Sequence, residues 1–201
     1  GTPTSDYSLQ DRTGHLINGP AWQPESGAIG GALSFDGNDD YVSIADYKGV
    51  TGTGTRTCSA WIKTSASGVE QTILSWGSST TSQKWLFRLA ASGKFSIGIW
   101  GAYIESQQVI NDGQWHHVAA VLPASDAPAI NHVLLYIDGV LDTQSHASSA
   151  LAINTSSAEE VLVGARASGT GTLAHFQGLI DEIRIYDQPL HDEEIIQLAG
   201  L

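Results

Sequence analysis

Three carboxylates and one amide lie within the five residues from Asp36 to Asp40, in a turn between two short runs that alternate apolar and polar residues. Like charges this close repel one another unless a cation or hydrogen-bond donors compensate them. A calcium ion is one candidate, because this hard cation takes about six to eight oxygen ligands from carboxylates and carbonyls. The alternative is a metal-free hairpin in which Asn and Asp side chains bond to their own backbone. The turn alone leaves both interpretations open.

Aromatic and arginine side chains in the middle of the chain have the chemistry of a sugar site, because sugars present apolar C–H faces and polar hydroxyls. In the run from 94 to 100, alternation places Phe95, Ile97 and Ile99 on one face and Trp100 on the other. The same parity turns Arg88 outward, so Arg88 and Trp100 are expected to be neighbours on an exposed face. The full candidate set is Trp100, Arg88, Tyr103 and Trp76, with Arg166 and His175 flanking the loop from 167 to 172.

Catalysis by acidic residues has a recognisable pattern, because retaining glycoside hydrolysis needs two carboxyl groups about 5 to 5.5 Å apart across a cleft. On a strand such a pair appears as acidic residues that alternate on one face. The neighbouring acidic residues of this chain, such as Asp39-Asp40 and Asp181-Glu182, are directly adjacent and do not alternate. The paired histidines His116 and His117 open a predicted strand and point to opposite faces, so we expect them to be structural. We therefore expect no catalytic residues.

The composition narrows the classes of partner. A formal net charge of −12 at pH 7 argues against nucleic acid and anionic membranes, because both attract clusters of Lys and Arg. The chain has no run of about 18 apolar residues, so no membrane insertion is expected. Cys58 is the single cysteine and is expected to be a small buried side chain. With 201 residues, 41% of them apolar, we expect one domain over residues 1 to 201.

The elements that must position these side chains are short strands, because apolar-polar runs alternate with glycine-rich turns throughout the chain. Helical spacing appears only in residues 191 to 198, which predicts a short C-terminal helix. The fold class is therefore all-β, an antiparallel sandwich of two sheets or a jelly roll. Beyond the runs beside the acidic turn, the predicted strands are 55–65, 72–76, 84–89, 94–100, 114–122, 132–137, 140–143, 150–153, 160–164 and 176–186.

Four segments of the chain, in the same order as in the family, resemble the LamG-like jelly-roll domains of the concanavalin A-like lectin/glucanase superfamily. They are GGALSFDGNDDYVSI at 30–44, SAWIK at 59–63, the run from NDGQWHHVAAV to LYIDGV at 111–140, and FQGLIDEIRIYDQPL at 176–190. The resemblance implies two antiparallel sheets packed face to face, with the N- and C-terminal strands beside each other.

The resemblance also implies a structural calcium ion, because many members hold one where the two terminal strands meet. Carried over residue by residue, its ligands would be Asp36, Asn38 and Asp181, far from any sugar. The alternative is that a basic side chain neutralises the carboxylates instead, and the candidates are Arg12, Lys48 and Arg184.

The function that the resemblance implies is a non-catalytic, lectin-like carbohydrate-binding module of a larger exported bacterial protein. Such a module would be extracellular or on the cell surface, with a polysaccharide or other glycan and the other domains of its parent chain as partners. The superfamily also contains glucanases and lyases, but their runs of catalytic residues do not occur here. The alternative is a protein-interaction or spacer domain of a surface or adhesin protein, with no sugar site.

Overall fold

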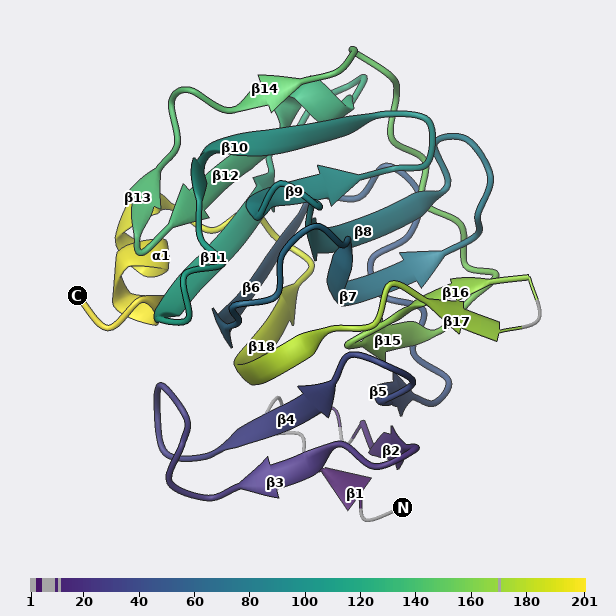
Figure 1. Cartoon of the computed structure of the whole chain (residues 1–201). Coiled ribbons are helices and arrows are strands. Elements are labelled where there is room, and N and C mark those ends of the chain that lie inside the picture. The colour runs from purple at the N-terminus through teal and green to yellow at the C-terminus, as the bar shows by residue number, and fades with distance from the viewer. Residues whose placement is uncertain (1–2, 5–9, 11, 170) are drawn as a thin grey trace.

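Two antiparallel β-sheets packed face to face form most of the structure, with a short helix near the C-terminus, as the sequence predicts (Figure 1). The computed structural model describes residues 3–4, 10, 12–169 and 171–201. Within this part of the chain, the nine-stranded sheet has the order β1 (Pro3–Thr4), β2 (Gly14–Ile17), β5 (Tyr41–Ile44), β15 (Val161–Val163), β7 (Gln71–Gly77), β8 (Lys84–Leu89), β9 (Lys94–Gly98), β10 (Tyr103–Val109) and β14 (His146–Ala147).

The second sheet has seven strands in the described residues, in the order β13 (Val140–Leu141), β12 (Leu134–Ile137), β11 (Trp115–Leu122), β6 (Arg56–Lys63), β18 (Gln177–Tyr186), β4 (Ala32–Asp36) and β3 (Ala21–Gln23). A separate small hairpin pairs β16 (Arg166–Ser168) with β17 (Gly171–Leu173). The helical elements are the 3₁₀ turn η1 (Ile130–His132) and α1 (Asp192–Leu198). None of the described helices is both long enough and apolar enough to cross a membrane.

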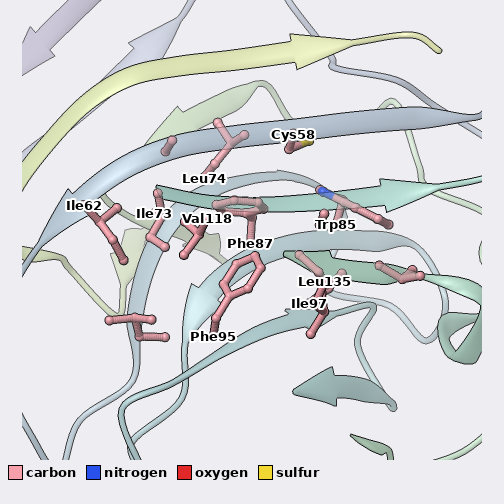
Figure 2. Packing of buried hydrophobic residues seen from close by; sticks show 14 of the residues in the cluster. Cys58, Ile62, Ile73, Leu74, Trp85, Phe87, Phe95, Ile97, Val118 and Leu135 are labelled. Atoms are coloured by element: carbon pink, nitrogen blue, oxygen red, sulfur yellow. The ribbon is translucent and has the colours of Figure 1, made fainter. Parts of the chain in front are cut away.

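The core lies between the two sheets and is filled from both sides. Figure 2 shows Cys58 and Ile62 of β6 packed toward Phe87 of β8 and Phe95 of β9 from the opposite sheet. The Phe87 and Phe95 rings meet edge to face, with centroids 4.8 Å apart, a favourable aromatic geometry. Phe95, Ile97 and Ile99 are all buried, which confirms the predicted parity of this strand, and Cys58 is buried as expected.

A second, smaller apolar cluster covers the outer face of the seven-stranded sheet. Ala119 and Val121 of β11 and Tyr136 of β12 pack there against Leu190 and Ile195, next to and within α1. The central strand β6 is buried over most of its length, including its polar residues Arg56, Thr57 and Ser59.

The first and last parts of the chain lie side by side, because β18 pairs with β4 in antiparallel register. This confirms the arrangement that the family resemblance implies. Gln177 lies opposite Asp36, and Ile180 lies opposite Leu33. The register fixes which C-terminal side chains can reach the acidic turn.

Three local predictions are wrong. The strand predicted at 94–100 ends at Gly98, so Trp100 belongs to a turn. The run 150–153 forms an isolated bridge from Ala152 to Ala129 rather than a strand. The loop predicted at 167–172 is the β16–β17 hairpin, and the strand β10 is absent from the predictions.

Candidate functional site

A pocket of about 230 Å³ opens on the outer face of the nine-stranded sheet. It lies between the turn that joins β9 to β10 and the β16–β17 hairpin, which are at the same end of that sheet (Figure 1). We call it the Trp100 pocket, and its lining is Glu70, Leu86, Arg88, Gly98, Trp100, Gly101, Ala102, Tyr103 and Arg166. Four of the six predicted ligand-binding residues line this pocket, so the structure brings them together from four separate segments.

Trp100 occupies a turn position that its side chain disfavours. Trp100 and Gly101 are the central residues of a tight hairpin turn, closed by a hydrogen bond from the Ile99 N–H to the Ala102 carbonyl at 3.0 Å. Their φ angles are +57° and +100°, and positive φ at both positions is typical of the type I′ turn, which favours Asn-Gly. Bulky residues rarely adopt positive φ, and such strain concentrates at functional sites. The turn holds the ring at the pocket with 38% of the residue exposed.

The charged part of the pocket is a carboxylate held between two guanidinium groups. Arg166 Nε donates to Glu70 Oε1 at 3.1 Å, and Arg88 Nη1 bonds to Glu70 Oε2. Both arginine side chains are only 17% exposed. The Arg166 guanidinium carbon also lies 5.4 Å from the centre of the Trp100 ring, within the range of a cation–π contact. The predicted neighbourhood of Arg88 and Trp100 is therefore present, with Arg166 and Glu70 joining the two.

Side chains of the nine-stranded sheet form hydrogen bonds to the chain segment around Arg166, which begins the β16–β17 hairpin. Lys84 of β8 is fully buried, and its ammonium group donates to the Ala167 carbonyl at 3.0 Å and to the Glu159 carboxylate at 3.1 Å. The Ser75 hydroxyl donates to the Ala165 carbonyl at 2.9 Å. Burial lowers the pKa of Lys84, and the attraction of Glu159 opposes that shift. These contacts fix the backbone on either side of Arg166.

Gly98 forms the floor of the pocket. It lies between Leu86 and Tyr103 in the cross-strand register, and Tyr103 is 37% exposed at the rim. A Cβ atom added at Gly98 would lie 3.6 Å from Leu86 Cβ and 3.7 Å from Arg88 Cζ, which are ordinary contacts. The missing side chain therefore leaves open space in the pocket rather than relieving a clash.

Sequence reasoning missed Glu70 and Gly98. Glu70 directly precedes β7 and shares its face with Thr72, which pairs with Arg88 across the strands. This diagonal relationship explains the ion pair, but it is visible only when the pairing of β7 with β8 is known.

Two predicted ligand-binding residues do not belong to the pocket. Trp76 is 1% exposed and packs in the core against Trp85, with its indole N–H donating to the Val50 carbonyl at 3.0 Å. Its ring cannot stack on a ligand, so this prediction is wrong. His175 lies at the acidic turn, where its ring nitrogens contact the Asp40 carbonyl oxygen at 3.3 Å and the Thr172 hydroxyl at 3.2 Å.

The acidic turn gathers three carboxylates, because oxygens of Asp36, Asp39 and Asp40 lie within 4.8 Å of one another. The Asn38 backbone N–H and side-chain amide donate to the two Asp36 oxygens at 2.8 and 2.9 Å, which lowers the pKa of Asp36. The Asp36 N–H donates to Asp40 at 3.0 Å, but burial raises the pKa of Asp40. The side chains of the turn therefore form hydrogen bonds within the turn, as the metal-free alternative predicts. The converging carboxylate oxygens also suit a cation.

Asp181 does not lie at this turn. It is four residues beyond Gln177, the partner of Asp36, and strand geometry makes this separation about 13 Å. The Asp181 carboxylate is 8% exposed and accepts hydrogen bonds from the Ile29 N–H at 2.9 Å and the Glu182 N–H at 2.8 Å. Burial raises the pKa of Asp181. The structure thus places Asp36 and Asn38 together but leaves Asp181 apart, so the three do not form one metal site.

The basic residues named as alternative partners of the turn contact other groups. Arg12 lies over the Tyr47 ring at 3.7 Å, Lys48 pairs with Glu160 at 3.5 Å, and Arg184 pairs with Glu182. The hydrogen bonds that compensate Asp36 therefore come from backbone and amide donors of the turn itself.

Comparison with solved structures finds the same fold in several other domains. Domain 4 of AbnA, a GH43 extracellular arabinanase from Geobacillus stearothermophilus solved with arabinotriose, superposes with a TM-score of 0.69 at 20% identity, covering 96% of this chain and 91% of that one. A SAP-like pentraxin from Limulus polyphemus gives 0.61 at 17% identity, over 84% and 81% of the two chains. At these identities the likeness shows a shared fold.

A third similar structure is the CBM40 domain of the Ruminococcus gnavus IT-sialidase, also solved with α2,3-sialyllactose. Its TM-score is 0.60 at 16% identity, over 74% of this chain and 84% of that one. No curated protein matches the sequence of this chain. The sequence profile of the Laminin_G_3 family, described as the concanavalin A-like lectin/glucanases superfamily, matches residues 36–196, and the chain therefore belongs to that family.

Proposed function

We propose that this chain is a non-catalytic carbohydrate-binding module and that the Trp100 pocket is its glycan site. The observation that carries the proposal is the placement of Trp100 at a strained turn beside Arg88, Arg166 and Glu70. A tryptophan held at positive φ costs stability, so its presence at a pocket favours a role in binding.

The chemistry of the pocket suits a sugar. The Trp100 and Tyr103 rings supply apolar surface for the C–H face of a pyranose or furanose ring, while the guanidinium groups supply hydrogen-bond donors for its oxygens. The volume of about 230 Å³ is below the usual range for drug-sized ligands and fits one sugar unit of a longer chain.

The absence of catalysis is part of the proposal and rests on the state of Glu70. Both of its carboxylate oxygens bond to arginines, so neither is available to contact a substrate as a catalytic group. Glycoside hydrolysis needs two carboxyl groups, one on each side of the scissile bond. Among the described residues that line the pocket, Glu70 is the only one with a carboxylate.

The relatives support this function and suggest where it operates. Two similar structures are domains that were solved with arabinotriose and with sialyllactose, and one of them is part of an extracellular arabinanase. We infer that this chain is likewise an extracellular module that holds its parent protein near a polysaccharide or other glycan.

The experiment is glycan-array binding by the wild-type chain and by Gly98→Val. The valine extends into the pocket, its Cβ atom meets Leu86 and Arg88 at ordinary contact distances, and valine suits a strand, so the fold should persist. Gln107→Val, on the exposed face of β10 outside the pocket, is the matched control. We expect Gly98→Val to lose glycan binding and Gln107→Val to keep it.

If the wild-type chain binds none of the plant, algal, bacterial and animal glycans on the array, the proposal is contradicted. That result would favour the alternative of a protein-interaction or spacer domain. Binding that Gly98→Val leaves intact would place the glycan site on another face of the molecule.

We also propose that calcium binds at the acidic turn, with Asp36, Asp39 and Asp40 as the carboxylate ligands. The support is the convergence of their oxygens, together with the low exposure of Asp40, 6%, which makes an uncompensated charge there costly. When bound, the ion would supply structural stabilisation of the β4–β5 turn.

A further inference from the structure

We propose that the Trp100 pocket selects sugars that carry a carboxylate, such as uronic or sialic acid units, over their neutral counterparts. This inference rests on the proposed glycan-binding function and adds the chemical class of the ligand. It is carried by the charge balance of the pocket and by the incomplete hydrogen bonding of its two largely buried guanidinium groups.

The charge of the pocket is opposite to that of the chain. Arg88 and Arg166 share the single carboxylate of Glu70, so the three side chains together carry a net charge of about +1 (two positive charges and one negative). The chain as a whole has a formal net charge of −12. Within the described residues, each arginine has Glu70 as its only ion-pair partner. The pocket is thus a local positive site on an acidic protein.

The two arginines that carry this excess positive charge are largely shielded from solvent. Both arginine side chains are 17% exposed, and Glu70 is 29% exposed. Arg88 Nε and Arg166 Nη1 are buried with no hydrogen-bond partner in the described structure. A guanidinium group that is desolvated without full compensation is costly, and an anionic ligand at its exposed edge recovers part of that cost.

The pocket brings a charged group and an aromatic ring together, so that one ligand can use both. Arg166 lies over the Trp100 ring at 5.4 Å and both residues line the pocket, so a sugar bound there contacts the ring and the guanidinium group together. Arginine presents a planar fork of N–H donors, which matches the two oxygens of a carboxylate better than a single hydroxyl. Glu70 occupies part of each fork and so holds both arginines in place for the ligand.

The experiment compares matched glycans that differ by a carboxylate. An array with paired neutral and acidic oligosaccharides identifies the tightest pair, and calorimetric titration then measures both members; trigalacturonate with galactotriose and 3′-sialyllactose with lactose are two such pairs. The variants are Arg166→Gln, which removes the excess positive charge, and Gly98→Val, which extends a side chain into the pocket. We expect the wild type to prefer the acidic member by about tenfold or more, as charge-assisted hydrogen bonds predict.

Arg166→Gln should weaken the acidic member more than the neutral one and reduce this preference to about threefold or less, because the variant removes the positive charge while the aromatic surface remains. Sodium chloride should weaken binding of the acidic member and leave the neutral member unchanged, since screening acts on charges; this test on the wild type stands even if the variant fails to fold. Equal or tighter binding of neutral glycans, abolished by Gly98→Val, would overturn the carboxylate preference and leave the glycan site intact. An array without any binding would overturn both.

Discussion

Trp100 is the residue at which binding and stability should oppose each other. Its φ of +57° costs an L-residue about 1 to 2 kcal/mol, and glycine adopts this conformation without that cost. We therefore expect Trp100→Gly to be more stable than Trp100→Ala by about 1 kcal/mol in chemical denaturation, since both lose the same ring contacts. Both variants should lose glycan binding. A Trp100→Ala protein as stable as Trp100→Gly would show that the turn is not strained.

His117 should make the fold sensitive to acid. The residue is 2% exposed beside Trp61, and burial lowers its pKa to about 4, with a further contribution from Arg184 and opposition from Asp138. The ordinary value is 6.5, so between pH 6.5 and 4 the unfolded chain binds a proton that the folded chain does not. The free energy of unfolding must therefore fall as the pH falls through this window.

Replacing His117 by Phe removes the titrating group and keeps a buried ring. Between pH 6.5 and pH 4.5 the wild type should lose about 2 kcal/mol more stability than His117→Phe, measured by urea unfolding at the two pH values. His146→Gln, at an exposed histidine, is the control and should follow the wild type. Identical pH dependence of His117→Phe and the wild type would contradict this assignment.

At the scale of elements, Lys84 connects the hairpin to the sheet. Lys84→Met keeps the length and burial of the side chain but removes the donors to Ala167 and Glu159. Because Glu159 is 29% exposed and can be solvated, we expect a loss of only about 1 to 2 kcal/mol in global stability. Backbone amides of 166–169 and 171–173 should exchange hydrogen faster, and glycan binding should weaken because Arg166 is less well held.

The control for Lys84→Met is Lys94→Met, at a partly exposed lysine 3.9 Å from Glu105 on the same sheet. It should leave exchange in the hairpin unchanged. Unchanged exchange in Lys84→Met would mean that contacts other than those of Lys84, such as the hydrogen bond from Ser75 to Ala165, fix the hairpin.

Alternation of apolar residues was sufficient to predict most of the strands, because a half-buried strand repeats every two residues. The strand β10, Tyr103–Val109, escaped this reasoning because Glu105, Gln107 and Gln108 give it little apolar content. Trp100 was predicted to lie on the exposed face of a strand, and its side chain does line the pocket. It does so from a turn, because the strand β9 ends at Gly98.

The residues of the candidate site could be predicted where the alternation within one strand determines their position. They could not be predicted where the pairing register between two strands determines it. Arg88 and Trp100 could be placed together from two neighbouring runs, whereas Glu70 required the pairing of β7 with β8. Trp76 was misplaced because an aromatic residue on a strand buried on both faces shows no alternation. Asp181 was assigned to the acidic turn from the family motif, and only the register of β18 on β4 shows their separation.

At the scale of the whole molecule, calcium should act as a stabilising ligand of the native state. We expect calcium to raise the thermal midpoint and a chelator to lower it, with a stabilisation of about 2.7 kcal/mol at a hundredfold excess over Kd. Asp39→Asn should abolish this response, because Asp39 belongs to the cluster. Asp126→Asn, at an exposed acid elsewhere, is the control. A midpoint indifferent to calcium and chelator would remove the ion from the account.

The most direct test of the central claim is an NMR titration of the ¹⁵N-labelled chain with a glycan that it binds on the array. Shift changes should concentrate on the Trp100 indole N–H, the amides of Gly98 and Gly101, and the Nε–H groups of Arg88 and Arg166, all in the pocket lining. Changes confined to residues outside this pocket, with these signals unmoved at saturation, would contradict the account.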